Sequence, residues 1–479
     1  MRSGPSKLWH RTKGPNALSF SPPSPTLPAV FYARIMASML SQFGALTLAP
    51  ETQFGELPWD FVALILLCLP VRARLRAREV SRGWHALLNE PRFWLVLNLS
   101  RGSGVVTRVS PRLLFASGER GRGHVHTLDL TGVGGFYSED LIEFVAAHGQ
   151  SLRSVMASEL RLLCADEVSR LCRSAPLCTL HCSVYCTAAE ALPLLRCEAP
   201  CALLHIFKLW VARFDNNQQA VLDFAAALPS HSGKIKELIV HGPRLGNVAV
   251  ADALMRSIAE AGVSDMSFAA GWQLAPASMR DLTRLLQAGC LETLVIFNDG
   301  EALFEFGPDL TAFCHALCNS TLQNLVLGQV ELWRYPDAAD ELLFSLLGHP
   351  TLRELSLHFD GVATNYSQRA AGERLASLIR HSSALRKLDL SGNQFRNACL
   401  APIFEALSRR SSTLKELRFD HESIRRKFAR DVILPVVRAN SSLRALSFGI
   451  DGDCNGLEPF PELKEAQAIV AARTQRHAP

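Results

Sequence analysis

The sequence predicts an α/β solenoid of repeated strand–helix units, with parallel strands on its concave face and helices outside, preceded by a small all-α unit of three helices. The first observation is a short pattern, apolar-x-x-apolar-x-apolar, which recurs from about residue 120 to the end of the chain. The second is that apolar residues at helical spacing follow many of the copies. The third is a run of three short, mostly helical pieces between residues 57 and 94.

Residues 1–50 are expected to form a disordered basic tail. They contain five basic residues and no acidic residue, and the Pro/Ser-rich stretch SPPSPTLP at 21–28 cannot hold a helix or a central strand. The same composition is typical of an organellar transit peptide, so an organellar repeat protein stays open as an alternative.

Residues 51–100 form the predicted all-α unit, which opens on the stretch LPWDFVALILLCLP at 57–70. Proline is tolerated at the start of a helix because its missing N–H has no intrahelical partner there, and Pro70 ends the same helix. The apolar run from Phe61 to Val71 spans eleven residues, which is well short of the roughly 20 residues that cross a bilayer. We therefore expect no membrane partner.

This unit has more large apolar residues than so short a chain can bury, and the excess predicts docking of a partner protein. We expect Val80, Trp84 and Leu87 to hold the unit together. The residues expected to face outward are Leu57, Pro58, Ile65, Leu66 and Leu69. The alternative is that the first helix packs against the chain's own first repeat. Four alternating arginines are interpreted as a solvated charged segment: Arg72, Arg74, Arg76 and Arg78.

The repeats are predicted over residues 120–455, with about 12 copies, and residues 456–479 are expected to form a C-terminal cap or tail. Clear copies are IKELIV (235–240), LETLVI (291–296), LQNLVL (322–327), LRELSL (352–357), LRKLDL (385–390), LKELRF (414–419) and LRALSF (443–448). Weaker copies are VHTLDL (125–130), LRSVMA (152–157), LCTLHC (177–182), LLHIFK (203–208) and VSDMSF (263–268). One strand and one helix at this period are typical of a leucine-rich-repeat solenoid. Asn393, at the ninth position of its copy, is expected to bond the turning backbone.

Composition and motifs argue against several classes of function. Beyond residue 50 the chain has 45 basic and 45 acidic residues, and a neutral body argues against a nucleic acid partner, since phosphate binding needs a clustered positive face. Seven of the 13 cysteines lie between residues 164 and 201 without C-x-x-C pairs, so they are interpreted as small buried apolar residues. The sequence contains no nucleophile elbow, zinc-protease motif or phosphate loop, so we expect no catalytic residue, metal or cofactor.

Residues 57–94 resemble an F-box. The pattern of that family begins with Leu-Pro, continues with Ile-Leu, a second Leu-Pro and a Leu, and ends with Val-Cys-Arg-x-Trp, a Leu and an aromatic-Trp pair. The matching residues are Leu57-Pro58, Ile65-Leu66, Leu69-Pro70, Leu75, Val80-Ser81-Arg82 with Trp84, Leu87 and Phe93-Trp94, and Ser81 stands where cysteine is common. The repeat region is similar to that of F-box/leucine-rich-repeat proteins, and its repeats resemble the ribonuclease-inhibitor type.

This resemblance implies a substrate-recognition subunit of a cullin–RING (SCF-type) ubiquitin ligase. In that family the F-box binds a Skp-type adaptor, and through it a cullin and a RING subunit, while the repeats recruit the protein to be ubiquitinated. Such a receptor performs no bond chemistry, and its expected location is the cytoplasm, the nucleus or both. The residues implied to bind the adaptor are Leu57, Pro58, Ile65, Leu66, Leu69, Pro70, Leu75, Val80 and Trp84.

Exposed strand positions on the concave face are the expected substrate contacts, because side chains alternate along a strand and solenoids bind ligands on this face. The candidates are Val295, Phe297, Trp333, Ser356, His358, Phe359, Asp389, Arg418 and Asp420. Phe297, Phe359 and Trp333 rank first because aromatic residues are favoured in binding hot spots. The competing function is a leucine-rich-repeat scaffold or ligand sensor without a ligase, in which the F-box-like helices cap the solenoid.

Overall fold

A computed structural model of the 479-residue chain gives the fold. It describes residues 59–69, 71–100, 111–121, 123–133, 137–157, 163–196, 203–212, 218–231, 234–241, 248–272, 279–298, 303, 307–358, 367–408, 413–419, 424–448 and 460–476. The expected tail at 1–50 lies outside the described residues. So do five of the candidate site residues: Leu57, Pro58, Pro70, Phe359 and Asp420.

The chain divides by its contacts into two compact units, Met1–Ile65 and Leu66–Pro479. The boundary falls inside helix α2 (Trp59–Cys68). Residues 59–65 are the described part of the first unit, and Val62 and Ala63 are buried there. The second unit contains every other described element.

Two short helices follow α2: α3 (Val71–Ala77) and α4 (Arg82–Leu87). The sequence predicts continuous helical spacing here, and the structure interrupts it with the turn that contains Val80. Ser81 caps α4, because its backbone is extended and its hydroxyl oxygen accepts the N–H of Trp84 at 3.1 Å. A serine therefore suits this position for a local reason.

A short 3-10 turn, η2 (Pro91–Phe93), closes this region. The side chains of Leu88, Phe93 and Trp94 are fully buried, and the indole N–H of Trp94 donates to the carbonyl oxygen of Leu88 at 2.7 Å. The aromatic pair of the sequence pattern is thus a core element rather than a surface element.

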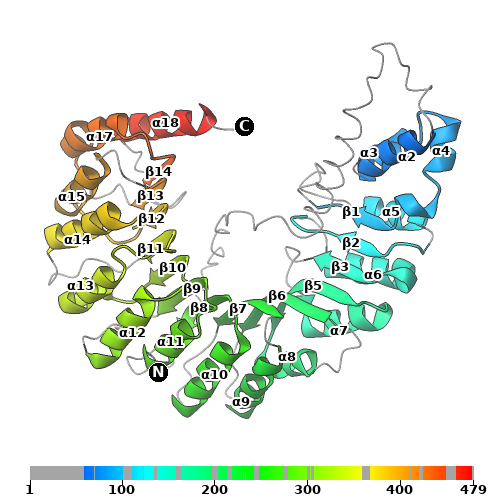
Figure 1. Ribbon diagram of the computed structural model, residues 1–479, viewed down its shortest axis with the longest axis horizontal. Helices are drawn as coiled ribbons and strands as arrows, with labels where there is room; N and C mark the ends of the chain where they lie inside the picture. The colour runs from blue at the N-terminus through cyan, green and yellow to red at the C-terminus, as the bar shows by residue number, and fades with distance from the viewer. Residues whose placement is uncertain are drawn as a thin grey trace, which may run out of the picture. The chain divides into compact units, whose positions relative to one another are not determined.

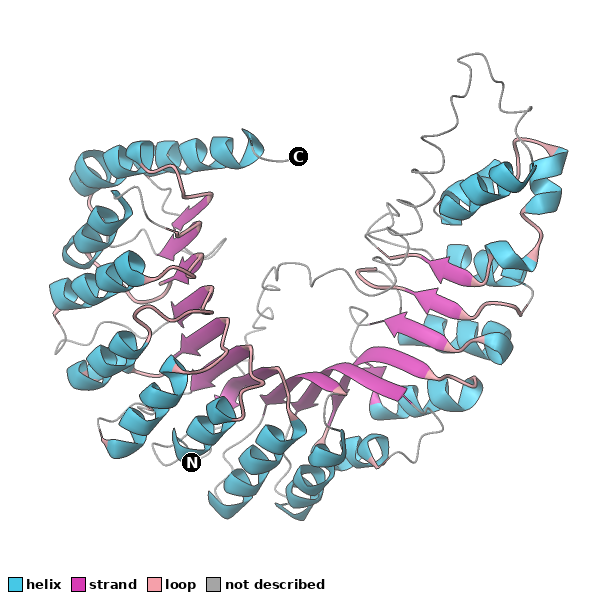
Figure 2. Ribbon diagram, in the orientation of Figure 1, coloured by secondary structure: helices cyan, strands magenta, loops and turns pink. Residues whose placement is uncertain are grey.

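One parallel sheet of 14 strands extends through the second unit, and it does not close on itself (Figure 2). Strand order follows sequence order, except that β4 pairs beside β5. The strands are β1 (Val96–Asn98), β2 (Thr127–Asp129), β3 (Ser154–Ala157), β4 (Leu163–Cys164), β5 (Thr179–Cys186), β6 (Leu203–Ala212), β7 (Ile235–His241), β8 (Asp265–Trp272), β9 (Thr293–Asn298), β10 (Asn324–Gly328), β11 (Glu354–His358), β12 (Lys387–Asp389), β13 (Glu416–Phe419) and β14 (Ala445–Phe448). Each predicted copy of the repeat pattern contains or begins one of these strands, which confirms the leucine-rich-repeat fold.

The helices form the second layer, on the outer side of the sheet (Figure 1). They are α5 (Pro111–Gly121), α6 (Ser138–His148), α7 (Ala165–Ser174), α8 (Ala188–Leu195), α9 (Gln218–Ala227), α10 (Val248–Ala261), α11 (Met279–Gln287), α12 (Pro308–Cys318), α13 (Pro336–Ser345), α14 (Gln368–His381), α15 (Asn397–Ser408), α16 (Arg426–Phe428), α17 (Leu434–Ala439) and α18 (Pro461–Arg476). Short helical turns join them: η4 (Gly149–Ser151), η5 (Leu228–His231), η7 (Leu332–Arg334) and the π-helical η8 (Ala429–Ile433). The last helix, α18, contacts both α17 and β14.

The pattern leucines fill the space between the two layers. Leu325 of β10 pairs in register with Leu294 of β9 and Leu355 of β11, and all three are fully buried. Because every copy supplies the same positions, each repeat buries the apolar face of its neighbour.

Asn393 ties one turn to the preceding strand, as predicted. Its side chain is fully buried, and its Nδ2 donates to the carbonyl oxygens of Leu357 at 2.6 Å and Leu390 at 2.8 Å. Its Oδ1 accepts the indole N–H of Trp333 at 3.1 Å.

The turns from helix to strand use other buried polar groups. The imidazole Nδ1 of His349 accepts the backbone N–H groups of Thr351 and Leu352, and its Nε2 lies 2.9 Å from the carbonyl oxygen of Leu317. Nε2 therefore carries the proton, and the ring is the neutral tautomer. Burial lowers the pKa of His349, and its hydrogen bond to Leu317 opposes this only in part.

Asn440 makes the same set of bonds in a later repeat. Its Oδ1 accepts the backbone N–H groups of Ser442 at 3.0 Å and Leu443 at 2.8 Å, and its Nδ2 donates to the carbonyl oxygen of Leu407 at 2.7 Å. The titratable ring of His349 and the neutral amide of Asn440 thus make equivalent hydrogen bonds in two repeats.

The first strand of the sheet follows directly on the three-helix region. Leu97 of β1 pairs with Leu128 of β2, and the N–H of Leu99 donates to the carbonyl oxygen of Asp129 at 2.8 Å. The sequence predicts only a short extended run here, separate from repeats that begin near residue 120. In the structure this run is part of the repeat sheet.

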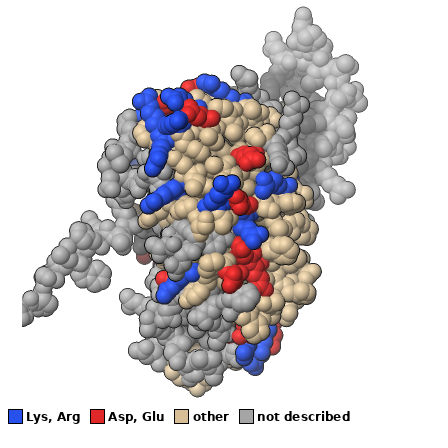
Figure 3. Space-filling view, turned by 90° about the vertical axis from the view of Figure 1, so that its left-hand side faces the viewer, with Lys and Arg blue, Asp and Glu red and all other residues tan. Residues whose placement is uncertain are grey.

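Charge on the surface is mixed in sign. Figure 3 shows Lys and Arg interspersed with Asp and Glu on the side of the molecule that carries α14 and α15 in Figure 1. Exposed ion pairs of the molecule include Arg374 with Asp340 at 2.7 Å and Arg438 with Glu465 at 2.5 Å. Among the described helices, none combines the length and the apolar character that a membrane span requires.

Candidate functional site

The residues expected to bind an adaptor differ in exposure. Leu69, Leu75 and Trp84 are half-buried, so part of each apolar side chain stays at the surface of the second unit. Ile65, at the end of the first unit, is also half-buried.

Two residues of this set lie differently from expectation. Leu66 is fully buried and not outward-facing, because successive residues of a helix point about 100° apart and Leu66 cannot share the face of Ile65. Val80 was expected to hold the unit together, but it is 67% exposed because it lies in the turn between α3 and α4. Leu66 is therefore a core residue, and Val80 is a surface residue.

The arginines after Pro70 are not a solvated segment throughout, because α3 is a helix and turns some of them inward. Arg74 is 7% exposed, and its guanidinium donates to the carbonyl oxygens of Leu69, at 2.8 Å, and Phe93. It also lies 5.9 Å from the ring centre of Trp94. Arg76 stays exposed, so Arg74 and Arg76 have different roles.

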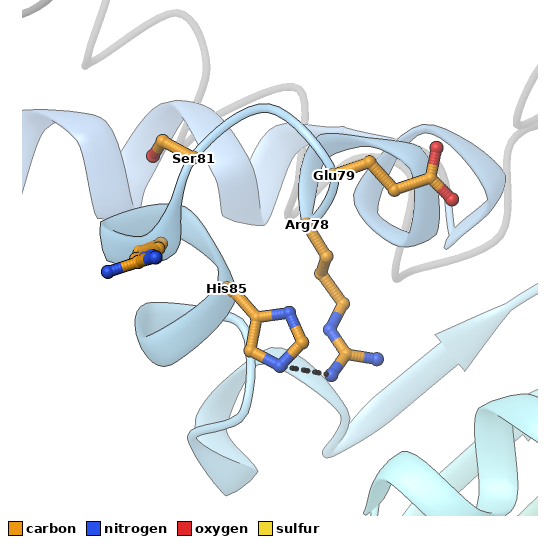
Figure 4. A pocket seen from close by; sticks show the side chains of 5 residues that line it. Arg78, Glu79, Ser81 and His85 are labelled. Carbon is orange, nitrogen blue, oxygen red and sulfur yellow. Dashed lines mark hydrogen bonds between the residues drawn. The ribbon is translucent and has the colours of Figure 1, made fainter.

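Arg78 is the second buried arginine and is 8% exposed. Its Nη2 donates to Oδ1 of Asn89 at 2.8 Å and lies 3.2 Å from Nε2 of His85. Burial lowers the pKa of Arg78, and the positive charge of Arg120 on α5 lowers it further. The ring of His85 and the guanidinium point toward each other in Figure 4.

A pocket of about 380 Å³ lies at this turn, and we call it the turn pocket. It is lined by Arg78, Glu79, Ser81, Arg82 and His85 (Figure 4). The sequence pattern places these residues in a helix and a charged segment and does not predict a pocket.

On the inner face of the sheet, the strand register brings four substrate candidates into one row. Val295, Val326 and Ser356 are successive partners across β9, β10 and β11. The row continues through Asp389 and Arg418. Val295 and Arg418 are half-buried, whereas Ser356 and Asp389 are 7% and 4% exposed. The carboxylate of Asp389 is also hydrogen-bonded within its own turn, because its Oδ1 accepts both the N–H and the hydroxyl of Ser391.

Phe297 and His358 lie in the next row, on either side of Gly328. Their rings are nearly parallel, with centres 6.4 Å apart. A Cβ at Gly328 would lie 2.4 Å from the ring of Phe297, so this position requires glycine for the ring to cross the strand. Nδ1 of His358 is 3.9 Å from Oδ1 of Asp389, which links the two rows.

Trp333 does not lie on the inner face. It belongs to η7, is fully buried, and makes an edge contact with Phe395 at 5.5 Å between ring centres. The expectation that it is a leading contact residue is wrong, because its indole is held inside the repeat by Asn393. Large aromatic residues are found in cores as well as in binding hot spots, and the sequence alone did not separate the two.

The first row also contains residues that sequence reasoning missed. Starting from Val295, the register leads back through Ser267 and Ile239 to Trp210 and Tyr185. Tyr185 is 44% exposed, and its ring meets that of Trp210 edge-on at 5.8 Å. We call the residues from Tyr185 to Val326 in this register the inner row. Ile239 and Val326 stand at the fifth position of clear copies of the repeat pattern and could have been identified from the sequence. Tyr185 and Trp210 could not, because a bulge in the pairing of β5 with β6 shifts the register of these strands.

Comparison with known families identifies the first module. The F-box domain family matches residues 54–96. Residues 54–96 are an F-box domain. The match contains α3, α4 and η2, and it ends at Val96, the first residue of the repeat sheet. The turn pocket therefore belongs to the F-box.

Solved structures with a similar arrangement include leucine-rich-repeat proteins, at low identity. The complex of TLR13 with ssRNA13 is 14% identical over 78% of this chain, which spans 56% of that chain, with a TM-score of 0.29. Rad7 in its yeast complex with Elc1 gives 10% identity, 78% and 95% coverage and a TM-score of 0.40. LegL7 from Legionella pneumophila gives 17% identity, 65% and 88% coverage and a TM-score of 0.28. No curated protein matches the chain.

Proposed function

We propose that this protein is a substrate-recognition subunit of a cullin–RING (SCF-type) ubiquitin ligase. In this role the F-box binds a Skp-type adaptor, which joins it to a cullin and a RING subunit, and the repeats hold the protein to be ubiquitinated. The chain itself performs no bond chemistry and needs no metal or cofactor. It raises the local concentration of the substrate beside the ubiquitin-loaded enzyme.

The observation that carries the proposal is the F-box domain at residues 54–96 joined to a leucine-rich-repeat sheet. Leu69, Leu75 and Trp84 of the F-box keep apolar surface for a partner. The inner row supplies a second apolar surface for a different protein. Aromatic side chains such as Tyr185 and Trp210 are favoured as anchors in protein interfaces.

Adaptor binding is tested with the full chain co-expressed with a Skp-type adaptor. Leu69→Asp with Leu75→Asp should abolish co-purification, because two carboxylates would be desolvated in an apolar interface. Phe344→Asp is the matched control, since Phe344 lies on α13 outside the F-box and is 70% exposed. If the intact chain recovers no adaptor, the ligase role is contradicted.

Substrate binding is tested separately by cross-linking in cells. Proteins held by the inner row should be lost with Trp210→Ala and Val326→Asp, yet recovered with the Leu69/Leu75 double variant. A protein lost with both sets of variants would instead depend on the assembled ligase. We expect the tagged chain in the cytoplasm, the nucleus or both, and import of residues 1–50 into an organelle would contradict this.

One observation favours the alternative, a scaffold without a ligase. β1 begins at the last residue of the F-box match and pairs with β2, so the end of the match is the first strand of the repeat sheet. A scaffold would keep its repeat partners and bind no adaptor, and the same two experiments distinguish the two functions.

A further inference from the structure

The turn pocket presents hydrogen-bond donors that the F-box does not use internally. Nη1 of Arg78 has no acceptor among the described residues, since both of its hydrogen-bond contacts involve Nη2. Its buried Nε also lacks a partner within the same part of the chain. Arg82, on the rim, is exposed.

The two neutral groups of the pocket are donors as well. A guanidinium can only donate, so Nε2 of His85 accepts from Arg78 and the ring proton sits on Nδ1. The hydroxyl oxygen of Ser81 accepts the N–H of Trp84, which leaves its hydrogen available for an acceptor. The pocket therefore offers donors from four residues, of which Arg78 and His85 face each other while the hydroxyl of Ser81 points away from them (Figure 4).

The charge balance of the pocket is positive. Its lining has two arginines and one carboxylate, Glu79, and Glu79 forms no ion pair with any described residue. Arg78 is a buried cation, and within the described part of the chain its hydrogen-bond contacts, with Asn89 and His85, are to neutral groups. A buried charge without a counter-ion is costly, and a bound anion would offset that cost.

We propose that the turn pocket binds a carboxylate side chain of the protein that docks on the F-box. A single carboxylate matches the excess of one positive charge, whereas a phosphate, with a charge near −2, would exceed that charge and be repelled more strongly by Glu79. Val80 is next to the pocket residues in the chain and is 67% exposed, so it supplies an apolar contact beside the ion pair. The partner segment is therefore acidic with a neighbouring apolar residue. This proposal rests on the proposed function.

The test measures the affinity of the full chain for a Skp-type adaptor by calorimetry at two salt concentrations. Arg82→Glu should weaken binding by roughly tenfold, as expected for loss of a charge-assisted hydrogen bond, and should flatten the salt dependence. Arg76→Glu is the matched control, because it makes the same charge change at an exposed arginine that does not line the pocket. Its affinity should stay within about twofold of the wild-type value.

A variant of opposite sign keeps the test independent of misfolding. Glu79→Gln removes the competing carboxylate and should tighten adaptor binding by about threefold. Equal losses with Arg82→Glu and Arg76→Glu, or no change in any of the three variants, would overturn the pocket while leaving the ligase role intact. Inhibition by inorganic phosphate beyond that of sodium chloride at equal ionic strength would overturn the carboxylate assignment. If the intact chain binds no adaptor, both proposals fail.

Discussion

The F-box and the repeats hold their buried polar groups in different ways. In the F-box, Arg74 and Arg78 are charged, and their contacts have no counterpart among the described repeats. In the repeats, the neutral side chains of His349 and Asn440 make the same bonds at equivalent positions, and the buried carboxyl group of Asp389 bonds to Ser391 within its own turn. The contacts of one repeat predict those of the other repeats, whereas the contacts of a single-copy module have to be determined residue by residue.

The largest effect is expected at Asn393, in the repeats. Asn393→Ala would remove the buried hydrogen bonds of the amide with two carbonyl oxygens and with the indole N–H of Trp333. We expect the free energy of unfolding to fall by about 4 kcal/mol, measured by urea denaturation.

The matched control for this change is Asn319→Ala, at an exposed asparagine that donates to one carbonyl oxygen, that of His315. It should change stability by less than about 0.5 kcal/mol. Equal effects of the two variants would contradict the role given to the buried amide.

Arg74→Met tests the single-copy contacts of the F-box. The methionine would keep much of the apolar stem but leave the carbonyl oxygens of Leu69 and Phe93 without donors. We expect a local loss of roughly 3 kcal/mol, seen by hydrogen exchange in residues 71–100 and not in the C-terminal repeats.

Arg76→Met, at the exposed arginine of the same helix, provides the comparison and should leave exchange unchanged. If Arg74→Met instead destabilised all repeats together, the F-box and the sheet would form one cooperative unit. That outcome would break the contrast between the two regions.

The smallest expected effect is a pH dependence of stability, which His349 confers and Asn440, at the equivalent position, does not. Because the folded state lowers the pKa of His349 below its ordinary value of 6.5, the folded state binds fewer protons than the unfolded state. The contribution of His349 is therefore complete above pH 6.5 and is lost as the pH falls from 6.5 through the folded pKa.

His349→Asn should keep most of the stability and remove this part of the acid sensitivity, whereas His349→Ala should cost about 2 kcal/mol at neutral pH. Thermal denaturation between pH 4 and pH 8 measures both. A wild-type curve that matches His349→Asn at every pH would show that folding does not change the pKa of His349.

The sequence predicted the structure best in the repeats, where every copy must pack apolar side chains in the same way. The leucine positions located the strands, since a sheet that packs one face on helices needs an apolar side chain at every second position. They also placed Val295, Ser356, Asp389 and Arg418 on the opposite face, where the strand register brings them into one row, although two of these are nearly buried.

The sequence was misleading where a turn or a tertiary contact decides the outcome. Helical spacing placed Val80 with Trp84, but the chain turns at Val80. Hydrophobicity could not show that Trp333 is inside, because that depends on Asn393, 60 residues away. The turn pocket depends on residues with unremarkable spacing and on Arg78, whose burial the sequence did not predict.

The pairing of β1 with β2 has a mechanical consequence. Both the N–H of His126 and that of Thr127 donate to the carbonyl oxygen of Leu95, so the strand that ends the F-box match is held to the first repeat by backbone bonds along its length. No freely rotating joint separates η2 from the sheet. A force applied to the end of the F-box would load these bonds in shear and pass into the first repeat.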